Sequence, residues 1–320
     1  MKEQMLRRLE ESLAQLAPSS PAGLYDPMRY ALGMGGKRMR PLLLLQAYAM
    51  YRIDWEEALP VAVGLETYHN HTLLHDDVMD RALVRRGEPT VWKKWNENTA
   101  ILSGDVMLIE AMAQVAKARG PHAKEVVALC SRTMREICEG QQYDMDFEQR
   151  NNVSVAEYME MIRLKTAVLL ACALQCGAML ADAPESHWQS LYDLGIHLGL
   201  AFQLQDDYLD CYGNSDIFGK AIGGDIREGK KTFLLINAFE RADSVQRTEL
   251  QRLLCDEADD EAKVKGVLAL YNELHIADLC TDEINRLFDA AHSDMEQLPV
   301  DSSAKAVLWQ YVESLWGRKA

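Results

Sequence analysis

Apolar residues recur at helical spacing along almost the whole chain, and this periodicity limits the folds it can adopt. A leucine stripe runs from Leu6 to Leu16, whereas alternating runs of β-branched residues are rare. Ser154 followed by Glu157 predicts a capping box that opens a long helix, apolar nearly all round after Lys165. Clusters of Gly and Pro separate the helical segments. The sequence predicts an all-α bundle of roughly ten or more helices joined by short connections.

With 320 residues, 48% of them hydrophobic, the chain can bury one large core. No linker rich in Pro, Gly or Ser divides it, so we expect a single all-α domain over residues 1–320. No apolar run approaches the roughly 20 residues that cross a bilayer, and residues 1–17 lack the pattern of a signal peptide. The seven cysteines form no CxxC motif, and Cys172 and Cys176 lie one helical turn apart on an apolar face. We therefore expect reduced thiols and a cytoplasmic location.

The formal net charge of −15 limits the partners of the chain. A surface this acidic repels nucleic acid and anionic membranes unless basic residues gather locally. We expect no nucleic-acid partner and no membrane span, and any local concentration of basic residues becomes a candidate anion site.

Two motifs of the form DDxxD each end a mostly apolar segment. They are Asp76, Asp77 and Asp80, and Asp206, Asp207 and Asp210. On a helix the outer carboxylates share a face, about 6 Å apart, and can jointly bind a hard cation. Mg²⁺ prefers oxygen ligands and commonly bridges carboxylates to substrate phosphates. A solvated acidic face is the alternative, but such a face, as in residues 256–263, has hardly any apolar neighbours.

Histidines close to the first motif raise a second possibility. His71 and His75 are spaced i, i+4, which can hold zinc, and His69 lies nearby. The adjacent aspartates favour a hard ion, however, and no further nitrogen or sulfur ligand falls in an obvious place. A hydrogen-bonded wall residue is the common role for such histidines.

Basic residues do concentrate around the two motifs. The cations are Lys37 and Arg40 after the Gly35–Gly36 pair, Arg85 and Arg86 after the first motif, Lys165 within an apolar helix, and Lys220 and Lys230 after the second motif. The Gly pair allows the backbone to approach a ligand closely. A lysine in an apolar helix needs a partner, whereas we expect Arg38 at the surface. Together the cations predict a ligand with several phosphates, and two such ligands.

From Gly35 to Lys231 the chain resembles the trans-isoprenyl diphosphate synthases of the polyprenyl synthetase family. The matching segments, in family order and spacing, are GGKRMRP, HNHTLLHDDVMD, RRGEPT, LKTAVL, FQLQDDYLD and GKAIGGDIREGKKT. The resemblance implies the isoprenoid synthase fold, a multi-helix bundle around a central active-site cavity, and a homodimer. It also implies three Mg²⁺ ions per active site, with isopentenyl diphosphate and an allylic diphosphate as substrates.

The resemblance implies a role for each matching residue. Isopentenyl diphosphate would be held by Lys37, Arg40, His69 and Arg86. The allylic diphosphate would be held by Arg85, Lys165, Lys220 and Lys230. The metal ligands would be Asp76, Asp77, Asp80, Asp206 and Asp210, with Asp207 in the same catalytic set. Thr166 and Gln203 would line the site near the reacting carbons, and Asp144 matches a family acidic position without an assigned role.

The implied reaction is a head-to-tail condensation that releases pyrophosphate. Bound cations neutralise the leaving diphosphate, and apolar helices keep water from the allylic carbocation. In this family the product grows along the helix of the first aspartates, where His71 lies about 7.5 Å and Tyr68 about 12 Å from Asp76. We expect these two side chains to form the floor of the pocket in which the product grows, which we call the chain-length floor. They therefore predict a short product, of fifteen or twenty carbons, with farnesyl favoured over geranylgeranyl.

Three other functions compete with this interpretation. A terpene cyclase shares the ionisation step but generally lacks a second DDxxD and a GGKRMRP-type segment. An inactive regulatory subunit should have lost some of the aspartates or cations, yet all are present. A purely structural helical protein would explain neither the aspartate motifs nor the cations around them.

Overall fold

The computed structural model describes residues 1–213, 222–255 and 260–316. Helices form nearly all the regular structure within these ranges, and the strands found there are β1 (Val84–Arg85) and β2 (Glu88–Pro89), a single short hairpin. The predicted all-α class is therefore confirmed. Lys220 lies outside the described residues.

Contacts divide the chain into two compact units, each assembled from three segments. Unit 1 comprises Met1–Arg132, Cys172–Tyr192 and Leu298–Gln310, and unit 2 comprises Thr133–Ala171, Asp193–Gln297 and Tyr311–Ala320. Helices α7 (Ala123–Glu148), α9 (Val168–Leu180), α10 (Glu185–Tyr212) and α17 (Ser302–Trp316) contribute residues to both units. A single domain over residues 1–320 stays a prediction.

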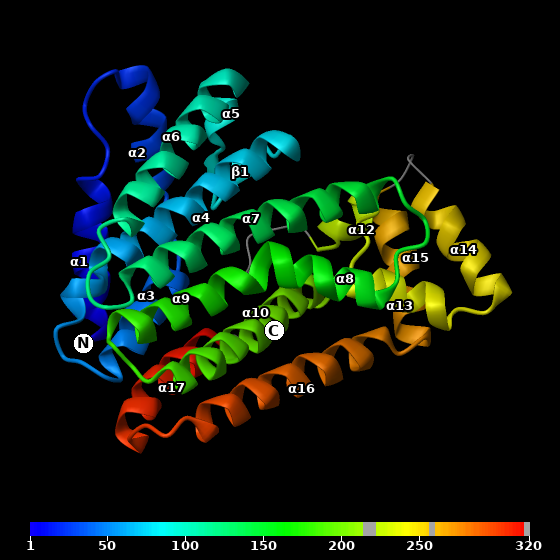
Figure 1. The fold of residues 1–320 in the computed structure, drawn as a ribbon. Helices are drawn as coiled ribbons and strands as arrows, with labels where there is room; N and C mark the ends of the chain where they lie inside the picture. The colour runs from blue at the N-terminus through cyan, green and yellow to red at the C-terminus, as the bar shows by residue number, and fades with distance from the viewer. Residues whose placement is uncertain (214–221, 256–259, 317–320) are drawn as a thin grey trace. The chain divides into compact units, whose positions relative to one another are not determined.

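Unit 1 is built around two long helices that pack side by side, α4 (Leu59–Met79) and α6 (Glu97–Val115) (Figure 1). A Cβ at Gly64 of α4 would lie 2.8 Å from the carbonyl oxygen of Ala111 in α6, so a glycine permits this close approach. The remaining elements are α1 (Lys2–Ala14), α2 (Ala22–Gly33), α3 (Met39–Ala49), the 3₁₀ turn Trp55–Ala58, and α5 (Val91–Lys94). Helix α1 buries Met5, Leu9 and Leu13, so its buried stripe begins at Met5.

The long helix predicted from Ser154 begins in unit 2 and consists of three parts. The capping box is present, with the Ser154 hydroxyl and the Glu157 carboxylate bonding each other's backbone N–H, and it opens α8 (Val155–Ile162). A π-helical turn, η2 (Arg163–Ala167), then leads into α9. Val155–Leu180 is long and apolar enough to cross a membrane, but 83% of its most apolar window is buried, as in the core helix of a folded domain. Such π turns are frequent at functional sites, and this one carries Lys165 and Thr166.

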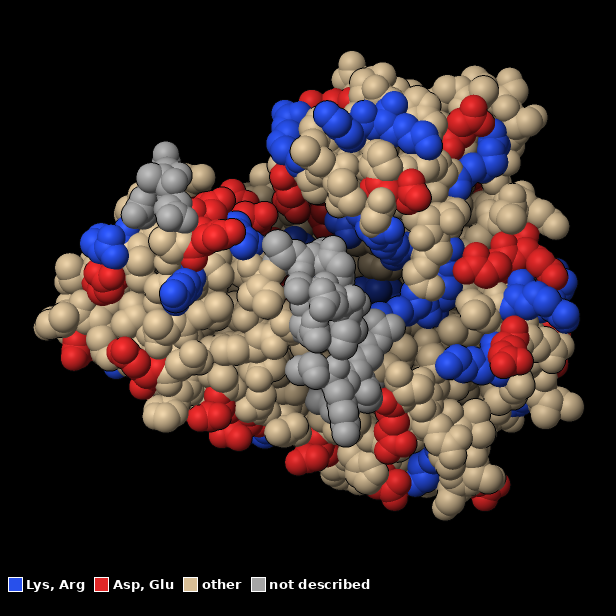
Figure 2. All heavy atoms as spheres, turned by 180° about the vertical axis from the view of Figure 1, so that it is seen from behind, with Lys and Arg blue, Asp and Glu red and all other residues tan. Residues whose placement is uncertain are grey.

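The rest of unit 2 packs on this helix and on the second half of α10. Its elements are α12 (Gly224–Glu228), α13 (Phe233–Arg241), α14 (Ser244–Cys255), α15 (Asp260–Glu273) and α16 (Ile276–Gln297). Ala167, Leu204, Leu234, Val267 and Ile276 are fully buried members of its apolar core. On the face that Figure 2 shows, acidic and basic side chains are intermixed, so neither positive nor negative charge dominates that face.

Helix packing in unit 2 predicts that Gly195 is indispensable. A Cβ there would lie 2.3 Å from the Cα of Ala171, a backbone atom that can move only with its helix. We expect Gly195→Ala to lower the free energy of unfolding by about 1–3 kcal/mol. Urea denaturation measures this.

Gly33→Ala in α2 is the matched control, since no atom lies within 4 Å of its added Cβ. The control should be neutral or gain up to about 1 kcal/mol. Equal stability of the two variants would contradict the packing argument.

Candidate functional site

A tight hairpin places the two arginines that follow the first aspartate motif. Arg86 and Gly87, between β1 and β2, have φ values of 54° and 82°, which is the signature of a type I′ turn. The Arg86 guanidinium donates to the carbonyl of Gly35 and lies 2.8 Å from the position of a Cβ on Gly36. The Gly35–Gly36 pair therefore makes room for an arginine side chain, and this holds the loop before α3 beside the hairpin.

A second contact in unit 1 joins Arg40 to His69. The guanidinium, which can only donate, gives a hydrogen bond to Nε2 of His69 at 3.1 Å. Removal from water and the neighbouring Arg40, Arg86 and Arg85 hold the pKa of His69 well below its usual value. The ring is therefore neutral at physiological pH, with its proton on Nδ1. Lys37, also in this loop, is exposed.

Arg38 is buried, and the expectation of a surface position was wrong. Only 2% of the residue is exposed, and its guanidinium bonds Glu66 of α4 (2.8 Å), Glu10 of α1 (2.8 Å) and the carbonyl of Leu32 (2.6 Å). A planar guanidinium can satisfy several acceptors at once, and a buried charge needs such partners. Arg38 thereby ties the loop of Lys37 and Arg40 to two helices. Its sequence neighbours gave no sign of this, because both acids lie 28 residues away.

The first aspartate motif buries its middle carboxylate. Asp77 is 4% exposed, and its Oδ1 accepts from Nε and Nη2 of Arg85, both at 2.8 Å. Burial raises the pKa of Asp77 to about 6, against the opposing charge of Arg85. Asp76 is half-buried, and Asp80, the C-cap residue that follows α4, is exposed. The outer pair is thus the accessible one.

The second motif, in unit 2, repeats this division. Asp207 is 4% exposed; its Oδ2 accepts from the hydroxyl of Tyr158 in α8 and its Oδ1 from the amide of Gln203, the latter at 3.1 Å. Burial raises the pKa of Asp207 to about 7, and nearby Asp225 adds to the rise. Asp206 is exposed, whereas Asp210 is half-buried and accepts from the Asp225 N–H at 3.0 Å.

The outer aspartates supply the donors that a magnesium ion prefers. Each motif offers carboxylate oxygens from two residues one helical turn apart, at the accessible side of its helix. The histidines near the first motif have other partners: His71 Nδ1 donates to the Gly104 carbonyl (2.9 Å) and His75 Nε2 to that of Ile101 (3.1 Å). Among the residues the structure describes, these histidines do not gather into a metal cluster, so the zinc alternative has no support here.

Lys165 has the partner that its apolar helix required. Its Nζ lies 2.6 Å from Oδ2 of Asp144 in α7, the acidic position that had no assigned role. Gly140, one turn before Asp144, allows the π turn to approach α7, because a Cβ added at Gly140 would lie 2.4 Å from the backbone nitrogen of Lys165. Within the same turn the Thr166 hydroxyl donates to Oε1 of Gln203 at 3.0 Å.

A hydrogen-bonded chain in unit 2 therefore links Thr166 to Gln203 and Gln203 to Asp207, with Tyr158 on the far carboxylate oxygen. Lys230, after the second motif, is half-buried. Its positive charge partly opposes the rise in the pKa of Asp207. Sequence reasoning missed Tyr158 and Asp225. Tyr158 follows the capping box directly but carries no motif, so only its contact reveals it.

The residues predicted to limit product length form an aromatic column on α4. Tyr68 is 1% exposed, and its ring centroid lies 5.6 Å from that of His71, which in turn lies 4.5 Å from that of His75. Gly104 of α6 leaves space for this column, because a Cβ there would lie 2.2 Å from Nε2 of His75. The column faces α6, whereas His69 faces Arg40.

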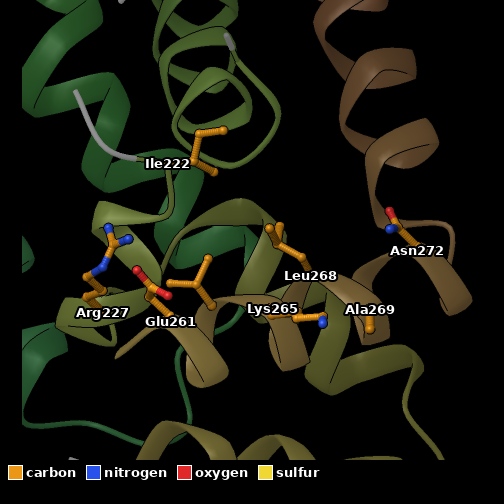
Figure 3. Close-up of a pocket in the computed structure, with 8 residues that line it drawn as sticks. Ile222, Arg227, Glu261, Lys265, Leu268, Ala269 and Asn272 are labelled. Carbon is orange, nitrogen blue, oxygen red and sulfur yellow. The ribbon is translucent and has the colours of Figure 1, made fainter. Parts of the chain in front are cut away.

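A shallow groove between α12 and α15 contains none of the predicted site residues (Figure 3). Arg227 and Glu261 lie together at one end, and Leu268, Ala269 and Asn272 lie toward the other. Its charged lining residues are Arg227, Lys265 and Glu261, and a single carboxylate does not form the aspartate pair that metal-assisted diphosphate chemistry needs.

Comparisons with known proteins agree with the motifs. A sequence profile described as polyprenyl synthetase matches residues 21–271. The chain is 37% identical over 267 residues to the short chain isoprenyl diphosphate synthase of Methanocaldococcus jannaschii, which covers 83% of this chain and 81% of that protein. It is 41% identical to the geranylgeranyl diphosphate synthase of Methanosarcina mazei over 73% of each chain.

Solved structures extend the likeness to the whole fold. A crystal structure of a geranylgeranyl pyrophosphate synthase matches with a TM-score of 0.94 and 42% identity, covering 100% of this chain and 99% of that one. Similar proteins are mostly named for geranylgeranyl products, with geranylfarnesyl and farnesyl synthases among them. The farnesyl preference expected from the sequence is therefore not supported.

The buried His71 predicts a pH dependence of stability. Burial lowers the pKa of His71 to about 4 from 6.5. Between pH 7 and pH 5 the unfolded chain takes up a proton at this site and the folded chain does not, so acidification favours unfolding by about 2 kcal/mol. We expect His71→Asn, which keeps a donor for Gly104, to lose less stability than the parent over this range in urea denaturation.

His275→Asn is the control, because His275 is exposed and its φ of 54° suits asparagine. Its pH dependence should equal that of the parent. A parental dependence in His71→Asn as well would refute the assignment to His71.

Proposed function

The chain belongs to the polyprenyl synthetase family as a trans-isoprenyl diphosphate synthase of short-chain type, and we propose that it condenses isopentenyl diphosphate with dimethylallyl, geranyl and farnesyl diphosphates. One observation carries the proposal: each DDxxD motif holds its middle carboxylate with a neighbour and presents its outer carboxylates. A merely acidic surface has no reason to fix its carboxylates in this way.

The basic loop and hairpin of unit 1 suit the diphosphate of isopentenyl diphosphate. We assign this group to Lys37, Arg40, His69 and Arg86. A neutral His69 with its proton on Nδ1 can donate to a phosphate oxygen while Arg40 holds Nε2. The arginines offer forked donors that match phosphate oxygens. Arg38, locked in its ion pairs, orients the loop.

The allylic diphosphate is assigned to Arg85, Lys165 and Lys230, and to Lys220 outside the described residues. Arg85 and Lys165 form ion pairs with Asp77 and Asp144, respectively. Polyprenyl synthetases use a divalent metal, typically Mg²⁺. We assign two ions to Asp76 and Asp80 and a third to Asp206 and Asp210, where they would neutralise charge on the leaving diphosphate. Asp77 and Asp207 orient these ligands instead.

Ionisation breaks the bond between C1 and the diphosphate oxygen, and the electron pair leaves with the diphosphate. The double bond of isopentenyl diphosphate then attacks C1, and the released pyrophosphate accepts the proton that is lost. The oxygens of Thr166 and Gln203 can face the carbocation, since the bond from Thr166 to Gln203 Oε1 leaves each oxygen a lone pair. The amide nitrogen of Gln203 donates to Asp207, which fixes the orientation of the carbonyl oxygen. No side chain of the set needs to act as a general base.

We propose a product of twenty carbons. Two features support this length: the large buried rings of Tyr68 and His71 along α4, and the geranylgeranyl products named for most relatives. We further propose a homodimer in the cytoplasm. The exposed apolar side chains Ile101, Leu102 and Ile109 of α6 supply a face for a second copy, and all seven cysteines are unpaired, as in a reducing compartment.

A product assay tests the activity. The protein is mixed with labelled isopentenyl diphosphate, Mg²⁺ and each allylic primer in turn, and dephosphorylated products are sized by chromatography. We expect a twenty-carbon alcohol that disappears with EDTA. Asp80→Asn should lose at least about 100-fold in kcat, whereas Asp260→Asn, on the exposed start of α15, should retain full activity.

Each other outcome has a distinct meaning. A cyclised hydrocarbon without incorporation of isopentenyl diphosphate would establish a cyclase. Absence of turnover with every primer would overturn the proposal and favour a regulatory subunit.

The chain-length floor has its own test. Replacing both Tyr68 and His71 by Ala removes the rings of the column, and we expect longer products in the same assay. Tyr68→Phe keeps the ring and should keep the product. An unchanged product spectrum in a folded double variant would refute the floor assignment without touching the condensation itself.

A further inference from the structure

Helix α1 contacts the basic loop (residues 35–40), although α1 lies outside the part of the chain that matches the family profile, which begins at residue 21. The contact is an ion pair. Oε1 and Oε2 of Glu10, on α1, accept hydrogen bonds from Nε (2.8 Å) and Nη2 (3.3 Å) of Arg38. Two parallel bonds of this kind fix an arginine more firmly than a single contact does. None of the residues assigned above to substrates or metal ions lies on α1.

The backbone of Arg38 needs such support. Its φ of 46° and ψ of 38° place this residue, which precedes α3, in the left-handed region. A residue with a Cβ adopts this conformation at an energetic cost, so the surrounding contacts must hold it there. Lys37 precedes Arg38 directly, and Arg40 follows two residues later. The turn at Arg38 therefore sets the directions in which these two cations leave the backbone.

Two acids hold the guanidinium of Arg38, and they differ in exposure. Glu66 on α4 is 2% exposed; it accepts from Nη1 and also from the side-chain amide of Asn70 at 3.1 Å. The side chain of Glu10 is 44% exposed, whereas that of Arg38 is fully buried. Loss of the Glu10 carboxylate removes the acceptor of Nε, and a buried charged group with an unsatisfied donor is destabilised. The left-handed turn then loses part of its support.

We propose that Glu10 of α1 is a positioning residue for the isopentenyl diphosphate site and acts on Lys37 and Arg40 through Arg38. The inference rests on the proposed function, which assigns those two cations to isopentenyl diphosphate. A loop that is competent to bind for only part of the time raises the apparent dissociation constant in proportion. The allylic site is held by other pairs, such as Arg85 with Asp77, and stays unchanged.

The first test compares Glu10→Ala with Glu11→Ala in the full chain. Glu11 is the matched control, because it is a half-exposed acid of the same helix that pairs with Arg7 and Arg8 of α1 itself. Isothermal titration calorimetry measures the binding of isopentenyl diphosphate with no allylic partner present, so no turnover occurs. For Glu10→Ala we expect the dissociation constant to rise at least about fivefold, as for a loop that is competent about one fifth of the time. The control should equal the parent.

Steady-state kinetics separate positioning from general loss of structure. In Glu10→Ala the KM for isopentenyl diphosphate should rise by the same factor, whereas kcat and the KM for geranyl diphosphate should stay at the parental values. A residue that merely stabilises the fold would not change the affinity for one substrate alone.

Linkage provides a measurement that does not depend on any variant folding. If α1 supports the basic loop, binding of isopentenyl diphosphate must stabilise the docked α1 in return. We expect this ligand to slow hydrogen exchange of the backbone amides of α1 in the parent, and to leave exchange in α14 of unit 2 unchanged. Exchange in α1 that does not respond to the ligand contradicts the proposal.

The outcomes distinguish this inference from the proposed function. Equal affinity of the parent and a folded Glu10→Ala variant for isopentenyl diphosphate overturns the role of Glu10 alone, and so does a loss of affinity for both substrates. A parent that does not bind isopentenyl diphosphate overturns the proposed function, and the positioning role with it.

Discussion

A carboxylate buried at the end of an apolar helix needs a hydrogen-bond donor or a cation as its partner. Both aspartate motifs meet this constraint in the same way. The middle aspartate turns inward and is bound, Asp77 by Arg85 and Asp207 by Tyr158 and Gln203. Each bond fixes the rotation of the helix end and leaves the outer carboxylates at the accessible side. The proposed metal chemistry depends on this orientation, because carboxylates that rotate freely would lose entropy on binding an ion.

Glycines in both units allow the close approach of neighbouring atoms on which this arrangement depends. Gly36 accommodates the guanidinium of Arg86, Gly104 the ring of His75, and Gly140 the π turn that bears Lys165. At each place a side chain that takes part in the candidate site, or supports it, lies where a Cβ would have been. The glycines therefore position chemistry as well as helices, and their substitution should affect both.

The basic residues of unit 1 act as a group in spite of the acidic total charge. Arg40, Arg85 and Arg86 lie close enough to keep His69 neutral, and buried Arg38 is balanced by Glu10 and Glu66. A net charge of −15 thus coexists with a locally positive loop and hairpin. Local fields of this kind decide which ligand binds, so overall acidity does not argue against a diphosphate substrate.

By itself the sequence determined the all-α class, the capping box at Ser154, the two aspartate motifs and the cations around them, because helical periodicity and motif spacing are local properties. It also required a partner for Lys165 but could not name Asp144, which lies 21 residues away. Only the tertiary structure decided that Arg38 is buried and that Tyr158 holds Asp207. These outcomes depend on which helices pack together, and packing brings together residues whose chemistry has no signature in the neighbouring sequence.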